Sequence, residues 1–268
     1  MAYKTIAQIF DLSGKGAIVT GGGSGIGMGI CRRLAEAGAG VTVADIDMNA
    51  AAKTVENIKS RGGKVQAVRA DVGSAEDAEK VVQATIDAFG SIDILVNNVG
   101  IFPSATFLDN SIELWDKVQN INVRGTFLYS KAAAKAMIKA KHGGKIINIA
   151  SVGSVKPMPA HTAYDTSKGA VLMLTKSMAL ELAPYNILVN AVAPGGISTQ
   201  GGAAAKVERG QILGLTDEQM GKNLMQRMPL GRVGVPDDIA KVVLFLASDA
   251  ADFMAGDMIL VDGGNLLT

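Results

Sequence analysis

A glycine-rich turn between a short apolar run and a helical segment constrains the fold of this chain more than any other feature. Residues 17–20 read AIVT, which is typical of a buried strand, and residues 20–27 read TGGGSGIG. Glycines at such a turn accept positive φ angles and let backbone N–H groups come close to a pyrophosphate. The start of the following helix also favours phosphate charge. The turn therefore predicts a nucleotide-binding strand–turn–helix unit, although a flexible turn that binds nothing is the alternative.

The rest of the chain alternates short apolar runs with longer amphipathic ones. Six further strands are expected at residues 41–45, 64–70, 92–96, 145–150, 187–192 and 258–261. Helices are expected from the glycine turn to about residue 38, from a cap at Asn49 to residues 62–63, and over 74–89, 111–140, 162–183 and 236–247. Strands this apolar are covered on both faces. The pattern predicts an α/β fold: a doubly wound Rossmann fold with a mostly parallel seven-stranded sheet and helices on both faces.

Residues 1–268 are predicted to form one dinucleotide-binding and catalytic domain, because no segment has the composition of a linker. The connection over residues 194–231 is unusually long and contains glycine pairs and short helical patterns. Connections of this length are commonly functional or disordered. Because ligands of open α/β sheets bind at the carboxyl ends of the strands, we expect residues 194–231 to be a loop that covers the substrate.

Composition excludes several classes of function. The formal net charge is only +1 and no basic block stands out, so neither nucleic acid nor a membrane surface is an expected partner. No apolar run reaches the roughly 18 residues of a membrane span, and the N-terminal segment lacks a signal-peptide layout. The lone Cys31 cannot form an internal disulfide and is expected to pack as a small apolar residue. With only two histidines, His142 and His161, no metal site is expected, and a cytoplasmic location is the default.

Within the turn the spacing is T-G-x-x-x-G-x-G, with Gly21, Gly25 and Gly27 in the fixed positions, and it differs from the general G-x-G-x-x-G fingerprint. This pattern resembles the short-chain dehydrogenase/reductase family. Further motifs extend the resemblance in the same order from Gly16 to Gly264, and they point to the branch of 3-oxoacyl reductases and sugar or polyol dehydrogenases. The resemblance implies that the cofactor contacts are Gly21, Ser24, Gly25, Ile26, Gly27, Asp45, Asp71, Val72, Asn98, Gly100, Tyr164, Lys168, Pro194, Gly195, Ile197 and Thr199.

An aspartate at the end of the second predicted strand indicates which dinucleotide is bound. Asp45 follows Gly27 by 18 residues, close to the spacing of about 20 that ribose-binding carboxylates show. A carboxylate there can accept both ribose hydroxyls and repels a 2′-phosphate, and the glycine turn holds no Arg or Lys to receive that phosphate. We therefore expect NAD rather than NADP. Asp47 could share the role, and a solvated strand-end aspartate is the alternative.

Three later motifs also match the family. By resemblance, Asp71 reaches the adenine amino group and Val72 adds backbone and packing contacts, although an exposed helix cap is an alternative reading of Asp71. Residues 97–100 read NNVG and resemble the family's N-N-A-G, with Val99 adding bulk beside the ribose. Residues 194–199 read PGGIST and resemble its P-G-x-I-x-T, which contacts the nicotinamide carboxamide.

The chemical signal is the pair Tyr164 and Lys168, which are four residues apart and share one face of a predicted helix, with Cβ atoms about 5–6 Å apart. A free tyrosine has a pKa of about 10, and a neighbouring ammonium and the positive nicotinamide are expected to lower it. The alternative is a Tyr–Lys pair on the surface of a helix, which would have the same spacing. Ser151, immediately after the fifth predicted strand, strengthens the signal because its hydroxyl can hold a substrate oxygen near Tyr164.

Asn122 matches the helix asparagine of the family, which implies a water that links Lys168 to solvent. Asn120 is close enough to confuse the assignment, and an amide on a polar helix face is an alternative. The resemblance thus implies a catalytic group of Asn122, Ser151, Tyr164 and Lys168.

Together these residues predict an NAD(H)-dependent oxidoreductase that interconverts a secondary alcohol and a ketone, with a polyol, sugar acid or cyclic alcohol as substrate. An NADH-linked 3-oxoacyl thioester reductase is the first alternative; a nucleotide-sugar epimerase or dehydratase and a non-catalytic NAD-binding scaffold are less favoured. The expected partners are a small-molecule alcohol or ketone and, from the family, three further copies of the chain in a homotetramer. Met158, Pro159 and His161 are expected to shape the substrate pocket together with the long connection.

Overall fold

The apolar runs form one central sheet in the computed structural model, which describes residues 3–268, so residues 1 and 2 of the predicted domain lie outside the described part. The sheet has seven strands in the order β3-β2-β1-β4-β5-β6-β7, and every neighbouring pair is parallel. The predicted fold is confirmed, and the sheet is wholly rather than mostly parallel. The strands are β1 Gly16–Thr20, β2 Gly40–Asp45, β3 Val65–Arg69, β4 Ile94–Asn97, β5 Gly144–Ile149, β6 Ile187–Pro194 and β7 Met258–Val261.

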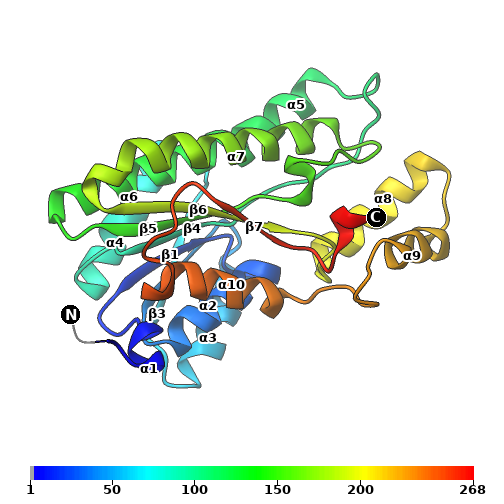
Figure 1. Ribbon diagram of the computed structural model, residues 1–268. Coiled ribbons are helices and arrows are strands. Elements are labelled where there is room, and N and C mark those ends of the chain that lie inside the picture. Colours follow the sequence, from blue (N-terminus) through cyan, green and yellow to red (C-terminus); the bar gives the residue numbers. More distant parts are fainter. Residues whose placement is uncertain (1–2) are drawn as a thin grey trace.

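Helices cover both faces of this sheet (Figure 1). One layer holds α2 Gly25–Glu36, α3 Met48–Lys59 and α10 Pro236–Ala247, and the other holds α4 Ala75–Phe89, α6 Gly125–Ala140 and α7 Thr162–Leu182, with α5 Ile112–Gln119 packed on α7. The strand order reverses between β1 and β4, and open α/β sheets bind their ligands at such a reversal.

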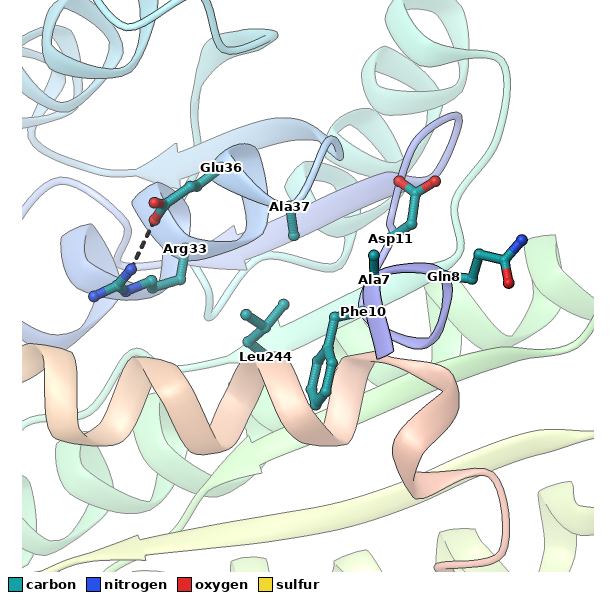
Figure 2. Close-up of a pocket in the computed structure, with 8 residues that line it drawn as sticks. All are labelled: Ala7, Gln8, Phe10, Asp11, Arg33, Glu36, Ala37 and Leu244. Atoms are coloured by element: carbon teal, nitrogen blue, oxygen red, sulfur yellow. Dashed lines mark hydrogen bonds and ion pairs between the residues drawn. The ribbon is translucent and has the colours of Figure 1, made fainter. Parts of the chain in front are cut away.

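A short N-terminal helix, α1 Ile6–Ile9, lies beside α2 and α10 and leaves a hollow of about 560 Å³ (Figure 2). Phe10 and Asp11, which line it, precede β1 in the chain, so the hollow lies at the amino ends of the strands. The guanidinium of Arg33 in its wall is already paired with Glu36 and Asp237. This hollow is therefore remote from the edge where the ligand is expected.

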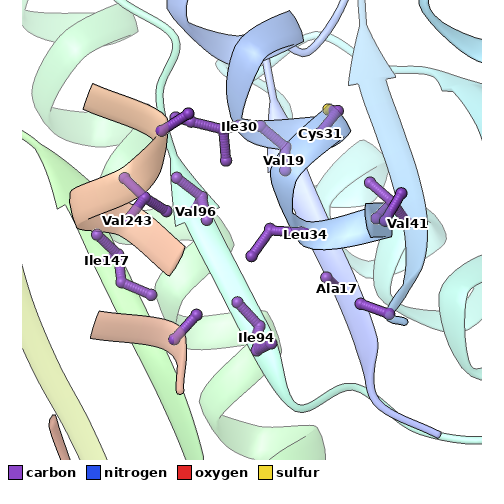
Figure 3. Close-up of a cluster of buried hydrophobic side chains, with 14 of the residues drawn as sticks. Ala17, Val19, Ile30, Cys31, Leu34, Val41, Ile94, Val96, Ile147 and Val243 are labelled. Carbon is purple, nitrogen blue, oxygen red and sulfur yellow. The ribbon is translucent and has the colours of Figure 1, made fainter. Parts of the chain in front are cut away.

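The core explains why the strands are apolar throughout. Val19 of β1 packs in one helical layer and Ile18 in the other, because successive strand side chains point to opposite faces. Ile30 and Leu34, four residues apart on α2, pack against the sheet face that carries Val19 (Figure 3). Cys31 is fully buried in the same cluster, as its predicted packing role requires, and burial raises the pKa of its thiol.

Two helices differ from the sequence expectation. The segment predicted as one helix over residues 111–140 is α5 and α6 joined by a π-helical turn, Asn120–Arg124, in which the Gly125 N–H donates to the Asn120 carbonyl. The helix predicted to be capped by Asn49 is capped by Asp47, whose carboxylate accepts the N–H groups of Asn49 and Ala50. A cap must precede the free N–H groups of the first turn, and Asn49 is already inside that turn.

The predicted covering segment, residues 194–231, contains two helices, α8 Gln200–Leu213 and α9 Asp217–Gln226. Both lie beyond the carboxyl ends of the strands, at the right of Figure 1. Thr199 caps α8 and Thr216 caps α9. Among residues 3–268, no helix is both long and apolar enough to cross a bilayer.

Candidate active site

The glycine turn after β1 is held in a tight conformation. Gly21 and Gly25 have φ angles of +64° and +52°, which disfavour any side chain. A Cβ on Gly27 would lie 2.1 Å from the Gly21 carbonyl oxygen. The Asn98 amide, at the end of β4, donates to the carbonyls of Thr20 and Gly21 at 3.0 and 3.1 Å. The turn therefore depends on these glycines and is fixed from the neighbouring strand.

The start of α2 beyond this turn fits a dinucleotide phosphate. Ser24 is the N-cap, and its side chain makes no capping hydrogen bond, so the first N–H groups of the helix are free to bind an anion. Ile26 is partly buried beside them. A Cβ on Gly25 would lie 3.4 Å from the Thr199 side chain, which brings the segment after β6 to the same place.

Asp45 at the end of β2 directs its carboxylate at this turn. Its oxygens accept the Gly23 N–H at 2.9 Å and the Asp47 N–H at 3.0 Å. The carboxylate of Asp47 is occupied as the cap of α3. Of the two candidates, Asp45 is the one placed at the glycine turn.

The remaining predicted cofactor residues lie at the same edge of the sheet. Asp71 is exposed, and its carboxylate accepts the Gly73 N–H, while Ser74 rather than Asp71 caps α4. Val72 is buried against Gly125. Pro194 ends β6, Gly195 donates to the Val261 carbonyl, and Ile197 pairs with Gly234.

Tyr164 and Lys168 lie on the first turns of α7, and Ser151 lies directly after β5. The Lys168 ammonium is 5.8 Å from the centre of the Tyr164 ring and donates to the Ile149 carbonyl at 2.7 Å. The Ser151 hydroxyl accepts the Gly153 N–H at 3.0 Å and is close enough to the Tyr164 hydroxyl to lower the pKa of the phenol. The structure thus brings the three side chains together.

Burial controls the protonation of this group. It raises the pKa of Tyr164 to about 12, against the lowering effect of Ser151 and with a smaller raising effect from Asp165. Burial also lowers the pKa of Lys168 to about 8. In the chain without a dinucleotide, desolvation of the phenolate is thus the largest effect on the pKa of Tyr164 and outweighs the lowering by Ser151.

Asn122 lies in the π-helical turn and is fully buried. Its side chain accepts the Ile101 N–H and donates to the Ile101 carbonyl and to Ser167, each at 2.9 Å. Asn120 instead lies at the surface and accepts a hydrogen bond from Arg124.

Gly100 lies between Lys168 and Asn122. A Cβ on Gly100 would lie 3.2 Å from Lys168 Nζ and 3.5 Å from Asn122 Oδ1. Asn122 is therefore placed with Lys168, and its amide is held entirely by protein groups.

Sequence reasoning expected His161 at the substrate pocket but missed two further neighbours of Tyr164, Phe102 and Asp165. The rings of Phe102 and His161 meet the Tyr164 ring edge-on, with centres 5.9 and 5.6 Å away. The Asp165 carboxylate accepts the Met158 N–H at 2.8 Å and fixes the loop between Ser151 and Tyr164. The acidic residue next to Tyr164 in the sequence was the only available signal for these neighbours. No motif indicated Phe102. Among residues 3–268, no group of three His, Cys, Asp or Glu is arranged to hold a metal ion.

Comparison with known proteins gives relatives along the whole chain. Residues 21–265 match the family model described as enoyl-(acyl carrier protein) reductase. The chain is 37% identical to the 2-dehydro-3-deoxy-D-gluconate 5-dehydrogenase of Escherichia coli over 97% of its length and 98% of that protein's. It is 39% identical to the L-rhamnose 1-dehydrogenase (NAD(P)(+)) of Azotobacter vinelandii, covering 93% of this chain and 96% of that one. A short-chain type dehydrogenase/reductase from Mycobacterium marinum superposes with a TM-score of 0.90 and 37% identity, over 98% of this chain and all of that one.

Proposed function

Because the chain belongs to the short-chain dehydrogenase/reductase family, we propose that it uses NAD(H) to interconvert a secondary alcohol and a ketone. The family and its relatives make the chain an oxidoreductase that acts on alcohols. Within that class we propose a polyol, a sugar acid or a cyclic alcohol as substrate. Two similar proteins are named as dehydrogenases of a sugar acid and of a sugar, which supports a sugar acid as substrate.

The observation that carries the proposal is the meeting of Ser151, Tyr164 and Lys168 at the strand edge that also holds the glycine turn. When bound at that turn, the dinucleotide supplies the hydride chemistry. In oxidation, Ser151 and Tyr164 hold the substrate hydroxyl, and the Tyr164 phenolate removes its proton. In reduction, Tyr164 returns the proton and Ser151 stabilises the oxyanion. Lys168 supplies the positive charge that favours the phenolate.

The preference for NAD rests on Asp45. Its carboxylate lies against Gly23, where the ribose of a dinucleotide bound at the turn is expected. A 2′-phosphate there would meet a negative charge, whereas ribose hydroxyls would meet an acceptor. The Azotobacter relative is named for both dinucleotides, so turnover with NAD⁺ has to be compared with turnover with NADP⁺.

The 3-oxoacyl thioester reductase is not favoured, because the similar dehydrogenases act by name on sugars and sugar acids. A homotetramer and a cytoplasmic location stay predictions. Exposed apolar side chains support self-association: Met173 and Leu180 lie on α7, and Phe253 and Leu267 lie near the C-terminus.

A turnover screen tests the proposed function. The purified chain is mixed with NAD⁺ or NADP⁺ and a panel of polyols, sugar acids and cyclic alcohols, and the absorbance of the reduced nicotinamide is followed. We expect turnover of at least one class, at least about tenfold faster with NAD⁺. Turnover confined to a 3-oxoacyl thioester would support the alternative. Tight NADH binding without turnover of any alcohol or carbonyl compound would show a binding scaffold and refute the proposal.

A further inference from the structure

A cation without a carboxylate partner lies beside the candidate active site. Arg209 of α8 is partly buried, its Nε is buried without a hydrogen-bond partner, and Nη1 contacts only the Met158 sulfur, at 3.6 Å. Among the salt bridges of residues 3–268, none includes Arg209. A guanidinium withdrawn from water without an acceptor is costly, so this group is suited to an anion that arrives from outside.

The position of α8 places Arg209 against the loop between Ser151 and Tyr164. The helix is capped by Thr199, beside the glycine turn, and a Cβ on Gly201 would lie 3.5 Å from the Phe102 ring. Phe102 in turn meets the Tyr164 ring. The contact between Arg209 and Met158 then joins the helix to the loop between Ser151 and Tyr164. Arg209 therefore lies at the loop that leads into Tyr164, close enough to His161 for its charge to lower the pKa of that imidazole.

A second unpartnered polar group lies beside Tyr164. His161 is only 7% exposed, its Nδ1 is buried without a hydrogen-bond partner, and its ring centre is 5.6 Å from that of Tyr164. Burial and the nearby charge of Arg209 lower the pKa of His161 to about 4. The imidazole is therefore neutral at pH 7 and has one N–H to donate and one nitrogen to accept a hydrogen bond.

The charge around Arg209 is positive on balance. Arg227, which follows α9, is close enough to lower the pKa of Arg209, after the larger effect of burial. The opposing charge is that of Asp165, whose Oδ2 is held by the Met158 N–H. Its Oδ1 lies against Gly153, where a Cβ would be 2.3 Å away, and does not reach Arg209. In the described part of the chain, the one nearby carboxylate, that of Asp165, thus forms no salt bridge with either guanidinium group.

We propose that Arg209 and His161 form the recognition end of the substrate site and bind a carboxylate of the substrate. This inference rests on the proposed function and narrows it: hydroxy acids of the aldonate type are the preferred substrates, and neutral polyols are poor ones. The planar guanidinium offers paired N–H donors that match a carboxylate, and His161 adds a neutral donor. Arg227 adds a second positive charge that attracts the carboxylate from a longer distance.

Matched substrates test this proposal. Each aldonate is compared with the alditol of the same length and configuration, with NAD⁺ at saturation, in the natural chain, in Arg209→Met and in Lys222→Met. Lys222 is an exposed cation on α9, so its loss removes the same charge from the same segment. We expect the natural chain to prefer aldonates. We expect Arg209→Met to lower the aldonate-to-alditol ratio of kcat/KM about 30-fold, mainly through KM, because it removes a charge-assisted hydrogen bond. Lys222→Met keeps the ratio.

The outcomes separate this inference from the proposed function. Turnover of alditols as good as that of aldonates, or an unchanged ratio in Arg209→Met, overturns the inference and leaves the oxidoreductase in place. Absence of turnover with every alcohol overturns the proposed function. In that case the shift in melting temperature that an aldonate produces in the presence of NAD⁺ decides the inference: the shift must be present in the natural chain and absent in Arg209→Met.

Discussion

Replacing Gly27 by alanine tests the glycine turn most sharply. The new methyl carbon would lie 2.1 Å from the Gly21 carbonyl oxygen and 2.6 Å from the Asn98 amide nitrogen. The first distance is about 1 Å shorter than such atoms tolerate. Neither neighbour can yield freely, because Asn98 is fixed by its hydrogen bonds to Thr20 and Gly21. The start of α2 must therefore move away from β1, at a cost of about 1–3 kcal/mol in the free energy of unfolding.

The same movement displaces the N–H groups that would hold the pyrophosphate. Loss of one hydrogen bond to a charged group costs about 1.5–3 kcal/mol, so we expect the Kd for NADH to rise at least about tenfold. NADH fluorescence titration gives the Kd, and urea unfolding gives the stability. Gly169→Ala is the control: Gly169 lies in α7, its nearest atom would be 3.8 Å from the new Cβ, and alanine is favoured in helices. A Gly27→Ala chain that binds NADH and unfolds like this control would refute the account of the turn.

Three further predictions follow from the site. Asp45→Ser removes the charge that opposes a 2′-phosphate, so the NADP⁺-to-NAD⁺ ratio of kcat/KM should rise at least about tenfold; an unchanged ratio would disprove the role of Asp45. With its pKa raised to about 12, Tyr164 is almost wholly protonated at pH 7, so oxidation should speed up as pH rises toward 10; a flat profile would contradict proton removal by Tyr164. Asn148→Ala breaks buried hydrogen bonds to Asn97 and Thr175 and should lower the free energy of unfolding by about 2–3 kcal/mol in urea titrations; a loss below about 0.5 kcal/mol would show these bonds to be unimportant.

The fold was predictable because burial on both faces makes each strand of a parallel sheet continuously apolar. The runs at residues 17–20 and 258–261 needed no tertiary information, and α10 has the predicted bounds 236–247. The break at Asn120–Arg124 was not predictable, because a single π-helical turn leaves the amphipathic pattern on either side in place. The cap at Asp47 was missed because two capping residues stand two positions apart, and only the backbone decides between them.

The candidate site was predictable as a set of residues and less so as chemistry. The chain order of Ser151, Tyr164 and Lys168 indicated that they meet, and the structure brings them together. The sign of the Tyr164 pKa shift could not be read from spacing, since it depends on how many atoms of other segments exclude water. For the same reason, the unpartnered groups of Arg209 and His161 become visible only when α8 is placed over the loop before α7.

Removal of one oxygen atom tests most directly the central claim, that the Tyr164 hydroxyl transfers the proton. Tyr164→Phe deletes the phenolic hydroxyl and keeps the ring that packs against Phe102 and His161. With the best alcohol of the screen and NAD⁺, we expect kcat to fall by a factor of about 10²–10⁴, while the Kd for NADH, measured by fluorescence, changes little. A Tyr164→Phe chain that turns over at a rate close to that of the natural chain would contradict the account, because the proton would then be carried by a different group.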